Sequence, residues 1–433
     1  MSDYELIVIT VAMFGLLFAG FPMMIPLIVP AIIAITFFLP TVSATNTLVG
    51  QIIIGIRPMT LICVPMFIFA SEVMTRGKSS TKLVEFVKAW IGHIPGGLAI
   101  STALSCTLFG AVSGSAQATV VAIGKPLHDS LLKEGYPPSF TYGLIVASSG
   151  IALLIPPSLT AVIYGVAAQC SVGALFLAGF STGLAVFLLF AIYCFIYARS
   201  KNIGTSAKYT LQERMKASKD SILALGFPLI ILGGIFSGIF SPTEAAAVAV
   251  AYAIIVEAVI YRDIKMKEII ESALSAGAIT AVVFILIGMG QVLSFVLTYS
   301  GVPQMIIPRI LGPNPSQLSL IILIMIVYFI ACMFVDVIVA IYVLAPIFAP
   351  FVTQLGINPI FLGALVVLQS AIGIASPPFG ASLFTAIAIF RRPYFEVARG
   401  LPWFIVLALI VCVIMIAFPE IVLFLPNLAG LGY

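Results

Sequence analysis

The chain has 433 residues, of which 62% are hydrophobic and only 8% are charged, and its formal net charge is +4. So few charged side chains exclude an ordinary soluble protein, and the small positive charge does not indicate a nucleic-acid partner. The composition predicts an all-α polytopic membrane protein in a lipid bilayer, because several nearly uncharged stretches approach or exceed the roughly 20 residues of a spanning helix. These stretches are 6–21, 27–39, 175–198, 222–240 and 401–425.

The first half of the chain, residues 1–198, begins with an acidic segment. This segment lacks the basic region of a cleaved signal peptide, so the first helix is expected to remain in the protein. Helices are predicted near 6–21, 24–39 and 58–75. Residues 79–93 then place apolar and charged side chains at helical spacing, which predicts an arm helix in the membrane interface, with an ordinary short cytoplasmic helix as the alternative.

Residues 94–124 are predicted to form a helical hairpin that enters the membrane and returns to the same side. Eight of the ten residues at 110–119 are Gly, Ala, Ser or Thr, which places the tip of the hairpin there. Both ends of the segment must lie on one side to keep Lys88 and Lys125 together. The alternative is a pair of full spanning helices.

The hairpin tip, Ser113-Gly114-Ser115, has two interpretations. Small residues let helices pack closely, which is the structural interpretation. The functional interpretation is an ion site, because helix ends expose unpaired carbonyl and amide groups and serine hydroxyls add oxygen ligands. A hard cation such as Na⁺ is bound by several such oxygens at once.

A sequence repeat places a double proline inside two apolar segments. Residues 135–158 and 356–379, 221 positions apart, align without a gap and are identical at nine of 24 positions. The shared positions are Gly135/356, Pro138/359, Phe140/361, Leu144/365, Val146/367, Ser149/370, Ile151/372, Pro156/377 and Pro157/378. Two successive prolines break a helix, and a matched pair of broken helices is typical of a secondary transporter's binding site. Broken helices are therefore predicted at 138–170 and 359–390.

A polar, basic segment at 199–220 is predicted to link the first half to a second half at 221–433. The second half is predicted to contain helices near 222–240, 243–261 and 272–299, a polar stretch at 303–317, a hairpin at 317–352, the second broken helix and a C-terminal helix. The first set of helices starts outside the membrane and the second starts inside. The two halves are therefore predicted to be inverted repeats.

Three acidic residues differ in their setting. Asp336 lies in the second hairpin, and it is the only charged residue between Arg309 and Arg391. Its cost in a membrane, about 2.5–3.5 kcal/mol, favours cation binding or proton handling, while pairing with backbone amides at the turn is the structural alternative. Glu244 follows Ser241 at a helix start and is interpreted as a cap. Glu257 lies near a helix end and is expected to be solvated.

The basic residues predict the orientation of the chain. One topology places 18 of the 20 lysines and arginines in the cytoplasm and leaves only Arg57 and Arg309 elsewhere. The positive-inside rule favours it. Both termini are then predicted to lie outside.

Signatures of enzymes are missing from the sequence. There is no phosphate-binding Gly-x-x-x-x-Gly-Lys-Ser/Thr motif and no His/Glu metal motif, so neither an enzyme nor a cofactor is expected. The six cysteines are scattered and are interpreted as small core residues rather than metal ligands. Work is expected to come from an ion gradient.

Four segments resemble the large membrane subunit of tripartite ATP-independent periplasmic (TRAP) transporters, of the dicarboxylate or sialic-acid type, over nearly the whole chain. They are Phe109-Gly-Ala-Val-Ser-Gly-Ser-Ala-Gln-Ala-Thr119, Ile155-Pro-Pro-Ser158, Phe240-Ser-Pro-Thr-Glu-Ala-Ala-Ala247 and Gly373-Ile-Ala-Ser-Pro-Pro-Phe-Gly380. The resemblance implies an elevator-type carrier with two re-entrant hairpins and two broken helices. It also implies Na⁺-coupled uptake of an organic acid across the bacterial inner membrane.

The resemblance also implies the site residues. Sodium is expected at Ser113, Gly114, Ser115, Asp336, Gly373, Ser376, Pro377 and Gly380. Substrate is expected at Ser113, Ser115, Pro156, Pro157, Ser158, Thr160 and Pro378.

Two partners follow from the resemblance: a small four-helix membrane subunit, expected to be a separate polypeptide, and a periplasmic substrate-binding protein. One alternative is a self-sufficient sodium- or proton-coupled anion carrier of the same two-hairpin architecture, because fold alone does not fix function. An ion channel or a membrane scaffold is a further alternative from another class.

Overall fold

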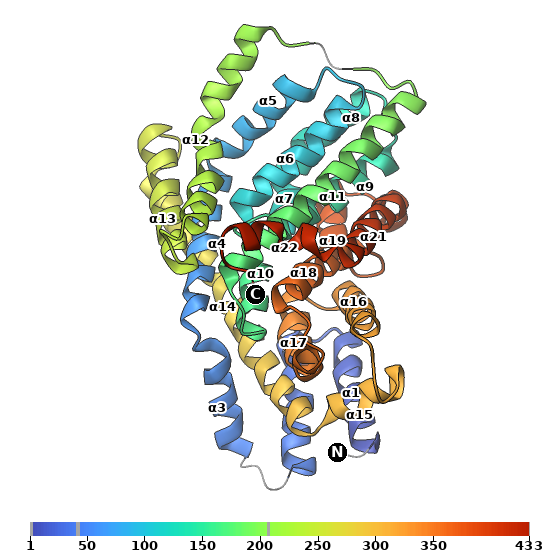
Figure 1. Cartoon of the computed structure of the whole chain (residues 1–433). Coiled ribbons are helices and arrows are strands. Elements are labelled where there is room, and N and C mark those ends of the chain that lie inside the picture. Colours follow the sequence, from blue (N-terminus) through green and yellow to red (C-terminus); the bar gives the residue numbers. More distant parts are fainter. Residues whose placement is uncertain (1–2, 40–43, 206–207, 433) are drawn as a thin grey trace.

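The computed structural model describes residues 3–39, 44–205 and 208–432, and within these ranges every element of regular secondary structure is a helix (Figure 1). Seven of the described helices are long and apolar enough to cross a membrane, or eight if one bent pair counts as a single span. The architecture is that of a polytopic membrane protein.

The first half contains α1 (Asp3–Phe18), α2 (Met24–Ile33) with a π-helical continuation (Ala34–Phe38), α3 (Ala44–Ile56), a 3-10 turn (Met59–Ile62), α4 (Cys63–Arg76), α5 (Ser79–Ile91), α6 (Gly97–Ser113), α7 (Ala116–Thr119), a π-helical segment (Val120–Gly124), α8 (Lys125–Lys133), α9 (Pro138–Ser149), a 3-10 turn (Gly150–Leu153), α10 (Leu159–Ala167) and α11 (Val172–Ser200). The second half contains α12 (Leu211–Phe236), α13 (Pro242–Ile254) with a π-helical continuation (Ile255–Ile260), α14 (Met266–Tyr299), α15 (Val302–Leu311), α16 (Gln317–Phe334), α17 (Val337–Gln354), α18 (Pro359–Ala375), α19 (Ala381–Phe390), α20 (Tyr394–Ala398), α21 (Leu401–Ala417) and α22 (Pro419–Leu428).

Both predicted hairpins are present as two helical segments joined by a tight turn. The first turns at Gly114 and Ser115, between α6 and α7. Its return arm runs through the π-helical segment directly into α8 and ends at Lys133, so the predicted end at 124 was too early. Pro126, which lacks an amide donor, does not end this segment, because the chain stays helical from the π-helical residues into α8. The second hairpin turns at Val335 and Asp336.

The two broken helices repeat each other in backbone detail as well as in sequence. Pro138 and Pro359 are the first residues of α9 and α18. The Pro156–Pro157 and Pro377–Pro378 bonds are both cis, and the glycines that precede each helix, Gly135 and Gly356, both have positive φ. The sequence repeat is therefore a repeat of structure.

The predicted linker at 199–220 was too long. α11 ends at Ser200, and α12 already begins at Leu211. A capping box starts α12, because Thr210 Oγ1 accepts from Glu213 N at 3.3 Å while Glu213 Oε2 accepts from Thr210 N at 2.7 Å. The polar residues after 210 therefore belong to a helix.

The helix predicted near 58–75 is present, as a 3-10 turn at Met59–Ile62 that leads into α4 and ends at Arg76. A separate helix, α3, precedes it and ends at Ile56, just before Pro58, which lacks an amide donor. Both pack along α14, the long third helix of the second half, which begins at Met266 rather than near 272. The C-terminal helix predicted over 401–425 is bent by 69° between α21 and α22. Pro419 opens α22 and marks that break.

Two glutamates have roles predicted from the sequence, and one of the two predictions was wrong. Glu244 Oε2 accepts hydrogen bonds from Ser241 N and Ser241 Oγ, both at 2.8 Å, which confirms the predicted cap of α13. Glu257, expected to be solvated, is fully buried because its carboxylate meets the first residues of α5.

Buried apolar residues form two clusters in the described chain. The larger one joins both hairpins, both broken helices, α4 and α11. The smaller one joins α1, α2 and α14, with Val339 of hairpin 2 at its edge. The hairpins and broken helices thus share one core, while α1 packs on α2 and α2 packs on α14.

A close contact between α9 and the turn before α21 allows a stability test. A Cβ on Gly143 of α9 would lie 2.2 Å from Gly400 O, whereas a Cβ on Gly277 of α14 would meet no atom within 4 Å. We expect Gly143→Ala to lower the free energy of unfolding by about 1–3 kcal/mol, as overpacking does. Gly277→Ala is the matched control, since alanine is the better helix former. Thermal unfolding in detergent checks both variants, and equal melting temperatures would contradict this packing.

Candidate functional site

The tip of hairpin 1 presses against the first helix break. Gly114 has a φ of +59°, a conformation that favours glycine, and it lies so close to Pro157 that a Cβ would be 2.4 Å from Pro157 O. One turn earlier in α6, a Cβ on Gly110 would lie 2.5 Å from Ala152 Cα. Glycine at both positions brings the backbone of the hairpin against the backbone of the break.

Hydroxyl and carbonyl oxygens gather at this tip. Ser113 Oγ lies 3.2 Å from Thr119 Oγ1, and Thr119 Oγ1 donates to Ser115 O at 2.8 Å. Ser71 of α4 donates to Ser113 O at 3.2 Å, which ties the tip to a neighbouring helix. Thr119 and Ser71 were not among the predicted site residues. Thr119 was detectable in principle, because it lies one helical turn after Ser115.

The first break buries its polar residues. Ser158 Oγ accepts from Ala161 N at 3.1 Å, which caps α10, and it donates to Leu153 O. Ser158 and Thr160 are both buried, and so are Pro156 and Pro157. The hydroxyl of Ser158 therefore replaces part of the backbone hydrogen bonding that the two prolines remove.

The tip of hairpin 2 carries Asp336, which is half-buried. One carboxylate oxygen, Oδ1, accepts from Ile338 N at 2.9 Å and caps α17. Asp336 therefore has the structural role given as its alternative, pairing with a backbone amide at the turn. The cap engages one oxygen, which leaves the second carboxylate oxygen for a cation ligand at the same place.

The second break lies beside this tip. The rings of Phe334 and Phe379 are 5.7 Å apart, one preceding Asp336 and the other following Pro378. Ser376 Oγ donates to Ile372 O at 2.7 Å, and a Cβ on Gly373 would lie 2.5 Å from Cys332 Cβ of hairpin 2. Gly373, Ser376, Pro377, Pro378 and Gly380 thus lie in or next to a break that contacts hairpin 2.

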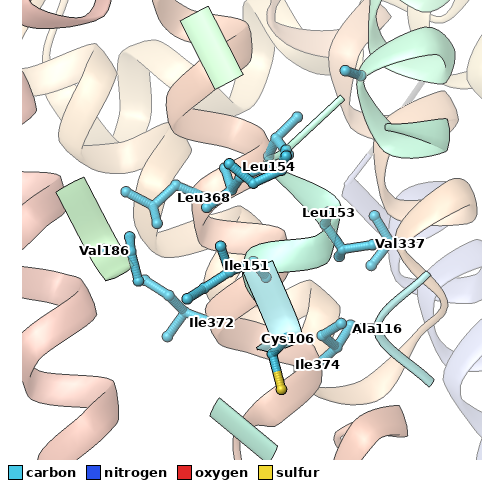
Figure 2. Packing of buried hydrophobic residues seen from close by; sticks show 14 of the residues in the cluster. Cys106, Ala116, Ile151, Leu153, Leu154, Val186, Val337, Leu368, Ile372 and Ile374 are labelled. Atoms are coloured by element: carbon cyan, nitrogen blue, oxygen red, sulfur yellow. The ribbon is translucent and has the colours of Figure 1, made fainter. Parts of the chain in front are cut away.

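The two pairs, each of a tip and a break, meet in one buried apolar cluster. Figure 2 shows Ala116 of hairpin 1, Val337 of hairpin 2, Leu153 of the first broken helix and Ile374 of the second in that cluster. Gly150 of the first broken helix also lies against the second, since its Cβ would be 2.9 Å from Ala371 O. Within the described ranges, no hydrogen bond joins the two tips directly. Apolar packing between the breaks brings the predicted residues into one region.

A cavity of about 580 Å³ lies behind hairpin 2, with walls from α10, α16, α17 and α18. Tyr164 and Tyr328 line it, and the buried Tyr328 hydroxyl has no hydrogen-bond partner within the described chain. None of the predicted site residues lines this cavity.

The polar side-chain atoms that the tips and breaks present are oxygens. In the described part of the chain, no group of three His, Cys, Asp or Glu residues could hold a metal ion. The tips and breaks instead offer serine and threonine hydroxyls, backbone carbonyls and one carboxylate, a set that suits a hard monovalent cation and excludes a structural zinc site.

Two hairpins and two broken helices around oxygen ligands define a secondary membrane transporter. The chain matches the family model of the "Tripartite ATP-independent periplasmic transporter, DctM component" over residues 10–421, and it belongs to this family. The resemblance noted in the sequence is thereby confirmed: the chain is a TRAP transporter large subunit.

Curated relatives cover almost the whole chain. The ectoine TRAP transporter large permease protein TeaC of Halomonas elongata is 49% identical over 422 residues, which are 98% of this chain and 99% of the relative. The C4-dicarboxylate TRAP permease DctM of Pseudomonas aeruginosa is 35% identical over 92% and 93% of the two chains, and the sialic acid permease SiaM of Vibrio cholerae is 34% identical over 97% of each.

A solved structure shares the fold. The YdaH transporter of Alcanivorax borkumensis superposes with a TM-score of 0.61 at 17% identity, over 87% of this chain and 89% of that one. The likeness bears on the arrangement of helices and not on the substrate.

The contact between tip and break can be tested with two glycines of positive φ. Gly114→Ala adds backbone strain and places Cβ against Pro157, while Gly135→Ala adds strain only, because nothing lies within 4 Å of its Cβ. The strain alone costs about 1–2 kcal/mol. We expect Gly114→Ala to lower the melting temperature more than Gly135→Ala and to abolish uptake. Equal uptake by the two variants would contradict the role of the tip.

Proposed function

We propose that this chain performs Na⁺-driven uptake of an organic carboxylate that a periplasmic binding protein delivers, together with a small four-helix membrane subunit. The observation that carries the proposal is the meeting of two hairpin tips and two helix breaks in one buried cluster. Broken helices at such a place supply unpaired backbone groups for ions and substrate. The family name, a tripartite transporter, supports the dependence on partners.

The sodium ligands of this proposal are oxygen atoms at the tips and at the second break. Ser113, Ser115 and the adjoining carbonyls supply one group, and the free oxygen of Asp336 supplies the charge in the other. Gly373 and Gly380 keep the backbone close enough to contribute carbonyls, since a Cβ on Gly380 would lie 2.5 Å from Ile374 O. Substrate would lie between the tips, against Ser158 and the prolines of both breaks.

An elevator mechanism is the movement that this packing supports. In the proposal the hairpins and broken helices move with α11 and α21, while α1 to α4 and α12 to α14 stay fixed, and the boundary between the two bodies runs along the contacts of α4 with α6 and of α14 with α17. The arm helices α5 and α15 join the two bodies. In the proposal the first body carries the site across the membrane, both termini lie in the periplasm, and the second body stays fixed.

The substrate is proposed to be a compact carboxylate, with ectoine as the first candidate. The two relatives named for ectoine are each 49% identical, whereas three named for C4-dicarboxylates are 31–35% identical and one named for sialic acid is 34% identical. All three compounds carry a carboxylate. Competition between ectoine, succinate and sialic acid for the cognate binding protein would distinguish them.

Uptake into proteoliposomes tests the proposal as a whole. We expect accumulation only when a Na⁺ gradient, the small subunit and the loaded binding protein are all present, because the residues that the structure describes include no soluble domain that could capture substrate. Full uptake by the chain alone would instead support a self-sufficient carrier. Uptake that follows a proton gradient and ignores Na⁺ would contradict sodium coupling.

Sodium binding can be measured without a substrate. A ligand that binds only the folded state raises the melting temperature as its concentration rises, so NaCl should stabilise the complex of chain and small subunit relative to KCl. Asp336→Asn and Ser115→Ala should reduce this difference to near zero. Glu244→Gln is the control, because Glu244 caps α13 at an exposed position away from the tips. An unchanged sodium effect in Asp336→Asn would contradict its assignment.

A further inference from the structure

A buried carboxylate outside the proposed transport site joins two segments of the chain, the π-helical one that follows α13 and the turn between α4 and α5. Glu257, in the π-helical end of α13, has no exposed surface. Its side chain meets the turn between α4 and α5, about 180 positions earlier in the chain. A carboxylate that is removed from water needs strong compensating hydrogen bonds.

The compensation comes from the start of α5. Glu257 Oε2 accepts from Lys78 N at 3.1 Å, and Oε1 accepts from Ser79 N at 3.3 Å and from Ser79 Oγ. These amides are among the first of a 13-residue helix, where the helix dipole favours a negative charge. Glu257 therefore caps a helix that belongs to another part of the chain.

The turn is shaped to admit this side chain. A Cβ on Gly77 would lie 2.0 Å from Glu257 Oε2, so a larger residue before Lys78 would have to displace the carboxylate. Charged residues around these two segments form ion pairs with one another rather than with the Glu257 carboxylate. Lys78 Nζ lies 2.6 Å from Asp263 Oδ1, and Arg76 lies 3.1 Å from Glu271.

Further contacts hold α5 to the same body along its length. Lys82 Nζ lies 3.9 Å above the ring of Tyr261, and Ser221 of α12 donates to Lys82 O at 2.8 Å. At the far end, Trp90 Nε1 donates to Ser218 Oγ at 2.9 Å. Figure 1 shows α5 between α12 and α6, and α5 packs on both.

The second arm is attached differently. α15 follows Gly301, has no side-chain cap at its start and packs on α14 and α17. Just before it, the hydroxyls of Thr298 and Ser300 are buried without a hydrogen-bond partner in the described chain. A buried carboxylate thus fixes the start of the first arm but not of the second.

We infer that Glu257 is a positioning residue that anchors the arm helix α5 to the α12–α14 body. The first arm then stays with that body during transport, and the movement between bodies falls at the α5–α6 corner, where Gly96 has a φ of +74°. The anchoring itself is a property of the fold, while its effect on transport rests on the proposed function.

The anchor is tested by a distance between two exposed positions. Spin labels at Thr81→Cys in α5 and Val259→Cys beside Glu257 report the separation of the two segments, in a Cys170→Ser background because the other five cysteines are buried. The complex of chain and small subunit should show one narrow distance distribution. Glu257→Ala should broaden it, and Glu257→Gln should restore part of it because the amide oxygen still accepts. Ser79→Ala removes one contact only and should broaden it less than Glu257→Ala.

Uptake supplies the second readout. Glu257→Ala is expected to lower the maximal uptake rate about tenfold, because conformational steps set many maximal rates, while KM changes less than twofold because Glu257 lies outside the proposed substrate site. Glu244→Gln is the control on the same helix. A narrow distance in Glu257→Ala, or an unchanged maximal rate, would overturn the inference. If the wild-type complex shows no Na⁺-dependent uptake, the proposed function fails, and the distance measurement still decides the anchor.

Discussion

In a lipid bilayer no water satisfies a backbone that leaves the helix, so each break must be closed by protein, ions or substrate. This chain interrupts its backbone at two hairpin tips and two double prolines. All four interruptions lie against one buried apolar cluster, and Gly114 and Gly373 bring the facing backbones into contact. Side-chain hydroxyls replace part of the lost hydrogen bonding, as Ser158 does for the first break. The carbonyl and hydroxyl oxygens that are concentrated there are what a sodium site needs.

The fold was predictable to the extent that it depends on proline, glycine and charge. The matched Pro156–Pro157 and Pro377–Pro378 pairs located both breaks, and the lone charge at Asp336 located the second tip within a residue of the observed turn. Element ends were harder, because they depend on capping. The polar residues after Thr210 resembled a linker until their capping box was seen, and the return arm of hairpin 1 continues through a π-helical segment that has no sequence signal.

Parts of the site depend on tertiary contacts that no local pattern encodes. Thr119 joins the first tip through Ser113 and Ser115, and Ser71 reaches the same tip from 42 positions away. Glu257 was expected to be solvated because it lies at a helix end, yet the α4–α5 turn covers it completely. Its contrast with Glu244, on the same helix, shows that a capping carboxylate can serve its own helix or a distant one. Only the fold determines which.

The central claim is that the tips and breaks form one sodium-binding centre. Its most direct test is a high-resolution structure of the chain with its small subunit, determined once in NaCl and once in KCl. We expect ion density in NaCl, held by oxygens of Ser113, Ser115 and Asp336 and by carbonyls of the second break. In KCl we expect this density to be absent. Tips that bind no ion in NaCl, or sodium density at a site away from all four interruptions, would contradict the account.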